Sequence, residues 1–149
     1  MGIQYMYLRF LTKLKKAFTN LILYWCFLTS SISFSQTLQE GIFTEAQAAR
    51  GAEEYAARCA SCHSADLRGN SNSPSLVGLS FMFIWEDRNL GELFEKMSSE
   101  MPTENPGSLS QQSYAAILAF IIKSNGFPAG ETVLASNAEA LSSIQISSQ

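Results

Sequence analysis

Cys59-Ala60-Ser61-Cys62-His63 is the stretch of sequence that decides the fold expected for this chain. Two thiols at this spacing on a turn can each form a thioether bond with one vinyl group of a haem, and the adjacent His63 is then held beneath the iron as an axial ligand. A covalently bound haem offers a large apolar surface around which a short chain can pack. The motif therefore predicts a small haem-binding domain, with Cys59 and Cys62 as attachment points and His63 as an iron ligand.

Other uses of a Cys-x-x-Cys pair fit this sequence less well. A redox dithiol would leave His63 without a role and is expected in a βαβ setting, which this chain lacks. A closed zinc site needs four ligands, whereas the chain beyond residue 35 holds two cysteines and the only histidine. A disulfide between cysteines this close would close too small a loop to stabilise the fold.

The first 35 residues differ in composition from the rest of the chain. They contain four of the ten basic residues and none of the thirteen acidic ones, and an apolar run at 21–28 precedes small residues that end in Ser33-Phe34-Ser35. This layout is typical of a secretory signal peptide, and the apolar run is short against the roughly 20 residues that a spanning helix needs. We expect a signal peptide at 1–35, cleaved before Gln36, and a periplasmic protein. An uncleaved segment would instead anchor the protein in the membrane, facing the periplasm.

The part of the chain from Gln36 onward is acidic. It carries six basic residues against thirteen acidic ones, a formal charge of −7. Such a charge argues against a nucleic-acid partner, because little on the surface would neutralise phosphates. It suits a protein that docks onto a basic protein partner, in a salt-dependent manner.

Local patterns predict a domain built from helices. Thr44-x-x-Gln47 is a capping box, in which each side chain bonds a free amide at the start of a helix expected at 45–59. A second helix is expected from Asn89, because Leu90, Leu93, Phe94 and Met97 recur on one helical face. A further helix starts at Ser110 and ends at Asn125-Gly126; its predicted buried face is Tyr114, Ile117, Leu118 and Ile121.

No stretch predicts a strand, so the expected class is all-α. The expected architecture is a small helical bundle around one covalently bound haem. Its domain spans 36–149, with a core at about 44–128 and a tail at 129–149 that lies over the domain. The residues at 81–86 are apolar and aromatic and suggest a short helix.

The second axial ligand of the iron has to come from a different residue type, because the chain has a single histidine. The candidates beyond residue 35 are Lys96, Lys123, Met82, Met97 and Met101. Met101 is favoured, because the following Pro102 pushes its backbone toward an extended conformation and removes a local donor, which suits a loop that presents a sulfur. Met97 ranks second; it and Met82 are better explained by core packing.

Ligation by His63 and Met101 would give the iron a raised reduction potential, because a thioether favours the ferrous form and burial disfavours the extra charge of the ferric form. It would also leave no open position for dioxygen or peroxide. The sequence therefore predicts an electron carrier rather than an enzyme. If Met101 did not bind, the open iron would suit a gas sensor or a peroxidase.

These residues resemble class I cytochromes c over essentially all of the chain after residue 35. Gly51 and Tyr55 match the small residue and the aromatic residue of the helix that, in the family, crosses the C-terminal helix. Here that helix would be 114–123, with Tyr114, Leu118 and Phe120 as candidate contacts. The resemblance implies that Pro74 supports the proximal His63 through its carbonyl group. It also implies that Trp85 lies near the haem propionates, although plain core packing would account for Trp85 too.

A more specific resemblance runs from Met101-Pro102 to Gly126-Phe127-Pro128-Ala129-Gly130. This stretch is similar to the cytochrome domains and subunits that accompany quinoprotein (PQQ-dependent) dehydrogenases. The resemblance implies electron transfer from such a dehydrogenase to the respiratory chain, through a terminal oxidase or another cytochrome. A permanently docked haem subunit is the alternative to a diffusing carrier. Arg68 and Arg88 are candidates to neutralise propionates, although solvated surface positions explain them better.

Overall fold

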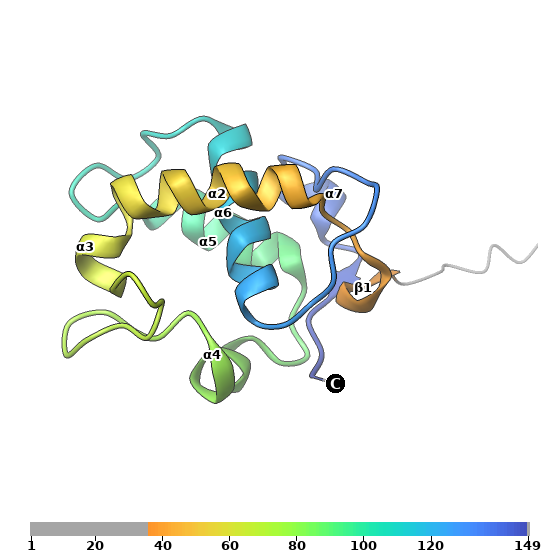
Figure 1. Ribbon diagram of the computed structural model, residues 1–149, viewed down its shortest axis with the longest axis horizontal. Coiled ribbons are helices and arrows are strands. Elements are labelled where there is room, and N and C mark those ends of the chain that lie inside the picture. Colours follow the sequence, from red (N-terminus) through yellow and green to blue (C-terminus); the bar gives the residue numbers. More distant parts are fainter. Residues whose placement is uncertain (1–35, 149) are drawn as a thin grey trace, which may run out of the picture. The chain divides into compact units, whose positions relative to one another are not determined.

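The computed structural model describes residues 36–148, so the expected signal peptide and its cleavage site lie outside the described residues. In chain order the elements are β1 (Gln36–Thr37), the 3-10 turn η1 (Leu38–Glu40), α2 (Glu45–Arg58), α3 (Ala60–His63), α4 (Gly78–Trp85), α5 (Leu90–Glu100), α6 (Gln111–Ser124), α7 (Ala138–Leu141) and β2 (Ile144–Gln145) (Figure 1). The predicted helical class is confirmed. One small departure is the pairing of the two-residue strands β1 and β2, which lie parallel with Gln36 opposite Ile144.

The three predicted helix starts lie where the capping residues indicate. The side chains of Thr44, Asn89 and Ser110 each accept a hydrogen bond from the backbone N–H three residues further on. These bonds satisfy amides that have no partner inside the helix. Local side-chain chemistry therefore determines where α2, α5 and α6 begin.

The capping box at the start of α2 is only half formed, which corrects the sequence prediction. Gln47 does not reach back to the first turn, because its side chain is buried and points to the chain near Leu134. Its Nε2 donates to the Leu134 carbonyl at 3.0 Å, and its Oε1 accepts from the Leu134 N–H at 2.8 Å. Gln47 is the only polar or charged residue classed as buried among the described ones. It therefore ties the tail to α2 rather than capping the helix.

Helices α2 and α6 cross at very short range, which is the contact expected from Gly51. A β-carbon built on Gly51 would lie 1.8 Å from the carbonyl oxygen of Ala116, so only glycine permits this approach. One helical turn further along, the rings of Tyr55 and Phe120 are 5.4 Å apart between centroids and tilted by 53°. Figure 1 shows α2 lying across α6 in the middle of the domain. The crossing holds the end of α2, and the Cys-x-x-Cys-His motif after it, against the core.

The tail beyond α6 packs on the domain and contributes to its core. The buried apolar tail residues are Leu134, Leu141, Ile144 and Ile146, whereas Val133 is exposed. A short helix that the sequence prediction omitted, α7, is capped by Asn137, whose side chain accepts a hydrogen bond from the Ala140 N–H. Among residues 36–148, no helix is long and apolar enough to cross a membrane.

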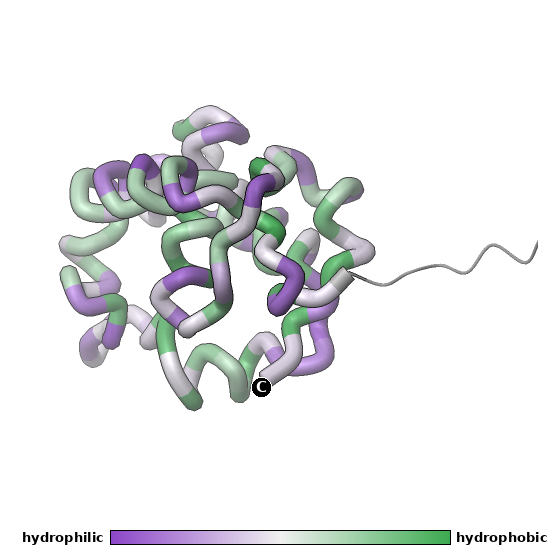
Figure 2. The backbone as a smooth tube through the Cα atoms, turned by 45° about the vertical axis from the view of Figure 1, so that its right-hand side comes forward, coloured by the Kyte–Doolittle hydropathy of each residue, from purple (hydrophilic) through white to green (hydrophobic). Residues whose placement is uncertain are grey.

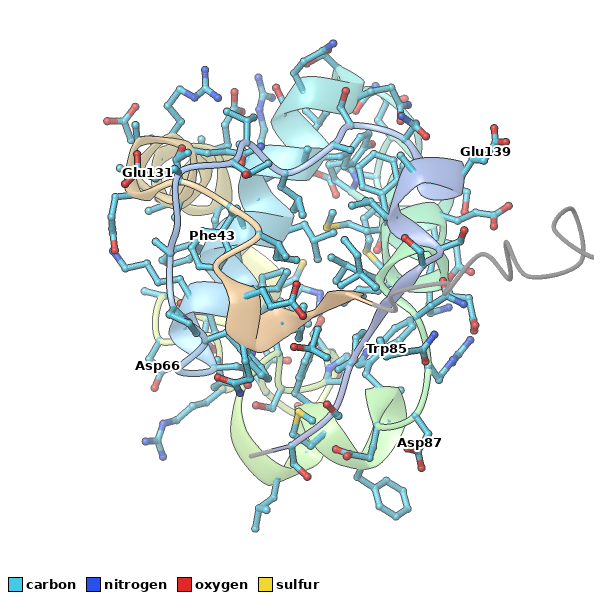
Figure 3. The ribbon with its side chains drawn as sticks, turned by 90° about the vertical axis from the view of Figure 1, so that its right-hand side faces the viewer. Phe43, Asp66, Trp85, Asp87, Glu131 and Glu139 are labelled. Carbon is cyan, nitrogen blue, oxygen red and sulfur yellow. The ribbon has the colours of Figure 1, made fainter. Side chains whose placement is uncertain are left out.

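Charged side chains lie at the surface. Figure 3 shows the carboxylates of Asp66, Asp87, Glu131 and Glu139 at the periphery, while Phe43 lies inside with none of its surface exposed. Helix α4 is different, since it is a largely hydrophobic segment (Figure 2) that leaves Leu79 and Phe83 exposed.

Candidate functional site

The Cys-x-x-Cys-His motif occupies one helical turn directly after α2. The N–H of Cys59 donates to the Tyr55 carbonyl, and the N–H groups of Cys62 and His63 both donate to the Cys59 carbonyl. The hydroxyl of Tyr55 donates to the Ser64 carbonyl at 2.7 Å and holds the end of the turn. Both thiols are free. The turn therefore presents two sulfur atoms that form no disulfide, and an imidazole, from a hydrogen-bonded support.

His63 is oriented by the backbone of a separate loop. Its Nδ1 lies 2.9 Å from the carbonyl oxygen of Pro74, which is the contact that the cytochrome resemblance implied. A carbonyl oxygen only accepts hydrogen bonds, so Nδ1 carries the proton and Nε2 carries the free lone pair. Such a bond holds the imidazole in the tautomer and the orientation that a metal ligand needs.

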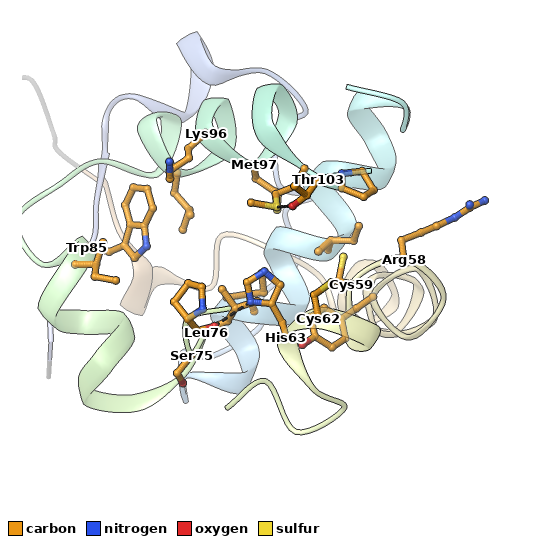
Figure 4. Close-up of a pocket in the computed structure, with 18 of the residues that line it drawn as sticks. Arg58, Cys59, Cys62, His63, Ser75, Leu76, Trp85, Lys96, Met97 and Thr103 are labelled. Atoms are coloured by element: carbon orange, nitrogen blue, oxygen red, sulfur yellow. Dashed lines mark hydrogen bonds between the residues drawn. The ribbon is translucent and has the colours of Figure 1, made fainter. Parts of the chain in front are cut away.

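The motif opens onto a cavity of about 920 Å³, including the space at its mouth. Figure 4 shows His63 and Cys62 on one side of the cavity and Met97 and Thr103 across from them. The lining is mostly apolar and comes from the residues Tyr55, Arg58, Cys59, Cys62, His63, Pro74, Ser75, Leu76, Ile84, Trp85, Leu93, Lys96, Met97, Met101, Pro102, Thr103, Glu104, Ile117 and Ile121.

Met101 lines this cavity and is hydrogen-bonded at both its backbone carbonyl and its side-chain sulfur. Its backbone is extended (φ −120°, ψ 154°), as the following proline predicted. The buried Tyr114 donates its hydroxyl to the Met101 carbonyl at 2.6 Å. The hydroxyl of Thr103 donates to the Met101 sulfur at 3.5 Å. Met97 also lines the cavity, whereas Met82 packs against the core and does not line it.

Trp85 lies at the opposite end of the cavity from Cys59 and Cys62 (Figure 4). It is 5% exposed and lines the cavity. The guanidinium of Arg88 lies 4.6 Å from the centre of a Trp85 ring and pairs with Glu92 at 2.6 Å. Arg88 therefore packs on the indole but is not among the cavity-lining residues.

The charged residues at the cavity are not the ones that the sequence indicated. Arg68 pairs with Asp66 on the exposed loop and does not line the cavity. The cavity is lined instead by Arg58, Lys96 and Glu104. The position of Arg58 directly before the motif was a signal that could have found it. Lys96 was weighed as an iron ligand rather than as a wall residue, and Glu104 stands in a loop without periodicity.

Burial governs the acidity of the groups beside the motif. Burial, followed by the nearby carboxylate of Glu104, raises the pKa of the Cys59 thiol to about 11. Burial, followed by the charges of Cys59 and Asp66, raises the pKa of Tyr55 to about 12. A redox-active dithiol needs a lowered thiol pKa. The raised value at Cys59 argues against that alternative use of the motif.

The residues around the cavity fit a covalently bound haem. Two free thiols and an imidazole with a free Nε2 lie on one side, a methionine sulfur lies on the other, and the wall between them is mainly apolar. No buried side-chain nitrogen or oxygen among the described residues lacks a hydrogen-bond partner. Within the same residues, no group of three His, Cys, Asp or Glu side chains is arranged to hold a metal ion.

Comparison with known families agrees with this chemistry. Residues 46–121, half of the chain, match the family described as cytochrome c oxidase, cbb3-type, subunit III. The chain therefore belongs to this family of cytochrome c domains. Such a domain binds haem c covalently and transfers electrons.

No match was found among curated proteins. Among solved structures, the chain is similar to one in the crystal structure of the sulfane dehydrogenase SoxCD from Paracoccus pantotrophus, with 23% identity and a TM-score of 0.47. That match covers 79% of this chain and 64% of the other, so this chain spans less than two thirds of the SoxCD chain.

Proposed function

We propose that this protein is an exported c-type cytochrome with one haem that carries single electrons. Cys59 and Cys62 hold the haem through thioether bonds, and His63 and Met101 are its two axial ligands. The observation that carries the proposal is the cavity itself, in which the motif faces a methionine that is fixed at both its carbonyl and its sulfur. When bound, the haem supplies a one-electron Fe(III)/Fe(II) couple. A single haem follows from the single Cys-x-x-Cys-His motif and the single histidine.

Each residue of the site has a separate task. The imidazole Nε2 of His63 donates to the metal, while the Pro74 carbonyl keeps the ring in place. The Met101 sulfur is a soft, neutral donor, which raises the reduction potential. The apolar wall excludes water and further disfavours the more highly charged oxidised form. A filled coordination sphere favours electron transfer over chemistry on a small molecule.

Met101 is preferred to Met97 as the second ligand on the basis of its contacts. Met97 lies within α5, and its carbonyl accepts a hydrogen bond from the Met101 N–H. Met101 lies just beyond the helix, with Tyr114 on its carbonyl and Thr103 on its sulfur. A ligand that has to keep one position in both oxidation states benefits from such support.

Trp85 is proposed to lie beside the haem propionates. Thioether bonds to Cys59 and Cys62 would hold the vinyl groups of a haem at that end of the cavity, and the propionates would then lie toward the far end. Trp85 lies at that far end (Figure 4). Lys96 also lines the cavity, and it is the basic residue proposed to lie near the propionates.

The partners are proposed from the resemblances and the charge. The stretch from Met101 to Gly130 supports a dehydrogenase, such as a PQQ-dependent one, as electron donor. The family description names an oxidase subunit, which supports a terminal oxidase as acceptor. It also favours a second candidate, in which the chain is a permanently docked haem subunit. Co-elution with a partner in size-exclusion chromatography at physiological salt would favour the docked subunit, and elution alone would favour the carrier.

The ligand assignment is tested by absorption spectroscopy of the purified holoprotein. A near-infrared sulfur-to-iron band is expected in the oxidised wild type and in Met97→Ala, and not in Met101→Ala. A band that survives in Met101→Ala but not in Met97→Ala would assign the sulfur to Met97. Absence of the band from the wild type, together with carbon monoxide binding to the reduced protein, would replace the carrier with an open-site haem protein. Periplasmic fractionation and the mass of the mature chain test export and cleavage before Gln36.

A further inference from the structure

Thr103 stands two residues after Met101 and directs its hydroxyl at the sulfur. The Oγ1–Sδ separation is 3.5 Å, within the range of a hydrogen bond to sulfur (Figure 4). This is the only hydrogen bond of the Thr103 side chain among the described residues. Thr103 also lines the cavity, so its methyl and hydroxyl groups form part of the wall beside the sulfur.

A thioether sulfur has two lone pairs, and a bond to iron uses one of them. The second lone pair is free to accept a hydrogen bond, for which the Thr103 hydroxyl is in place. Accepting that bond draws electron density from the sulfur and makes it a weaker donor. The oxidised metal, which carries one more positive charge, loses more by this than the reduced metal does.

We propose that Thr103 is a positioning residue that raises the reduction potential of this cytochrome by hydrogen-bonding to the sulfur of Met101. The inference rests on the proposed ligation by Met101 and extends it to a residue that touches the ligand rather than the iron. The pattern Met-Pro-Thr at 101–103 then contains the ligand, the residue that extends its backbone and the residue that tunes its sulfur.

The contacts of Thr103 separate this role from a structural one. Thr103 is exposed and is not part of the hydrophobic core. The loop is already anchored by the bond from Tyr114 to the Met101 carbonyl and by the burial of Pro102. Replacing the hydroxyl by a methyl group therefore removes the bond to the sulfur and leaves those anchors in place.

The test is redox titration of four holoproteins: wild type, Thr103→Val, Thr103→Ser and Thr132→Val. Valine matches the shape of threonine without the donor, and serine retains the donor. Thr132 is an exposed threonine of the tail that does not line the cavity, so Thr132→Val controls for the loss of any surface hydroxyl. The loss of one hydrogen bond should change the equilibrium constant between the oxidised and the reduced protein by about twofold to tenfold. At about 59 mV per tenfold for one electron, Thr103→Val should lower the potential by about 20 to 60 mV.

A lowered potential in Thr103→Val with near wild-type values in Thr103→Ser and Thr132→Val supports the proposal, as does a shifted near-infrared sulfur band in Thr103→Val alone. An unchanged or raised potential in Thr103→Val overturns it, and so does an equal shift in the serine variant. Met101→Ala separates this failure from that of the ligand assignment. If that variant keeps the band, or the wild type lacks it, the ligation by Met101 is wrong. If the band depends on Met101 while Thr103→Val changes nothing, only the role of Thr103 is wrong.

Discussion

The crossing of α2 and α6 offers the sharpest test of how this fold is held together. Gly51→Ala places a β-carbon 1.8 Å from the Ala116 carbonyl oxygen and 2.4 Å from its carbonyl carbon. Real β-carbons essentially never come closer than 3.0 Å to another atom. The two helices would have to separate by roughly 1 Å, because the obstacle is backbone and cannot rotate aside as a side chain could.

The expected effect is the difference between two opposing terms. Alanine stabilises a helix interior by about 1 kcal/mol relative to glycine. Overpacking a tight contact costs about 1 to 3 kcal/mol and sometimes more. Opening the crossing also weakens the Tyr55–Phe120 ring pair, and such pairs contribute about 0.5 to 1.5 kcal/mol. We expect the steric cost at the crossing to exceed the gain in helix propensity. The free energy of unfolding should fall by about 1 to 3 kcal/mol, and Tm by about 4 °C for each kcal/mol.

The measurement is thermal and guanidinium unfolding of the holoprotein, followed by far-UV circular dichroism. The matched control is Ala49→Gly on the exposed side of α2, which measures the helix-propensity term alone and should cost about 1 kcal/mol. If Gly51→Ala were as stable as the wild type or more stable, the crossing of α2 and α6 would not need glycine at residue 51. The close approach of α2 to α6 would then be the wrong explanation for Gly51.

Three further predictions follow from single contacts. Gln47→Ala leaves the buried N–H and C=O of Leu134 without partners and should lower the free energy of unfolding by about 2 to 4 kcal/mol in guanidinium melts. Tyr114→Phe removes the bond to the Met101 carbonyl and should cost about 1 kcal/mol, with the near-infrared sulfur band lost at lower denaturant than in the wild type. The pKa of Tyr55 is about 12 in the folded protein against an ordinary 10.0, so the folded state keeps the phenol proton to higher pH than the unfolded state does. The stabilisation from this pKa difference is complete below pH 10 and is lost as the pH rises through about 12. Tyr55→Phe should therefore weaken the alkaline loss of stability, measured as the unfolding midpoint against pH.

Each of these predictions has its own control. Gln112→Ala, at an exposed position of α6, should change stability little, and a comparable loss there would remove the special role of Gln47. A sulfur band in Tyr114→Phe as resistant as in the wild type would mean that the Tyr114 hydroxyl does not support the ligand loop. An identical pH profile for wild type and Tyr55→Phe would assign the alkaline transition to other groups.

Much of the domain follows from short stretches of sequence. The Cys-x-x-Cys-His motif defines the class of protein, because its chemistry depends on residues within one turn. Thr44, Asn89 and Ser110 set the helix starts through bonds to amides three residues away. Pro102 sets the extended backbone of residue 101 by local sterics. All of these effects act within a few residues, so the sequence alone contains them.

Other features depend on segments that are far apart in the chain. Gln47 looked like the second half of a capping box, yet its amide bonds Leu134, which lies 87 residues away. The first turn of the helix offers the Gln47 side chain one hydrogen bond, whereas the tail offers two in a buried site, where polar groups without partners are costly.

The walls of the site show the same division. Charge and loop position singled out Arg68 and Arg88, but the charged residues that line the cavity are Arg58, Lys96 and Glu104. The carbonyl group of Met101 acquires its hydrogen bond only once α6 carries Tyr114 to the end of α5. The sequence by itself determined that a haem-binding helical domain would form. The tertiary structure alone decided which side chains surround the cavity, because burial and long-range hydrogen bonds exist only after the chain has folded.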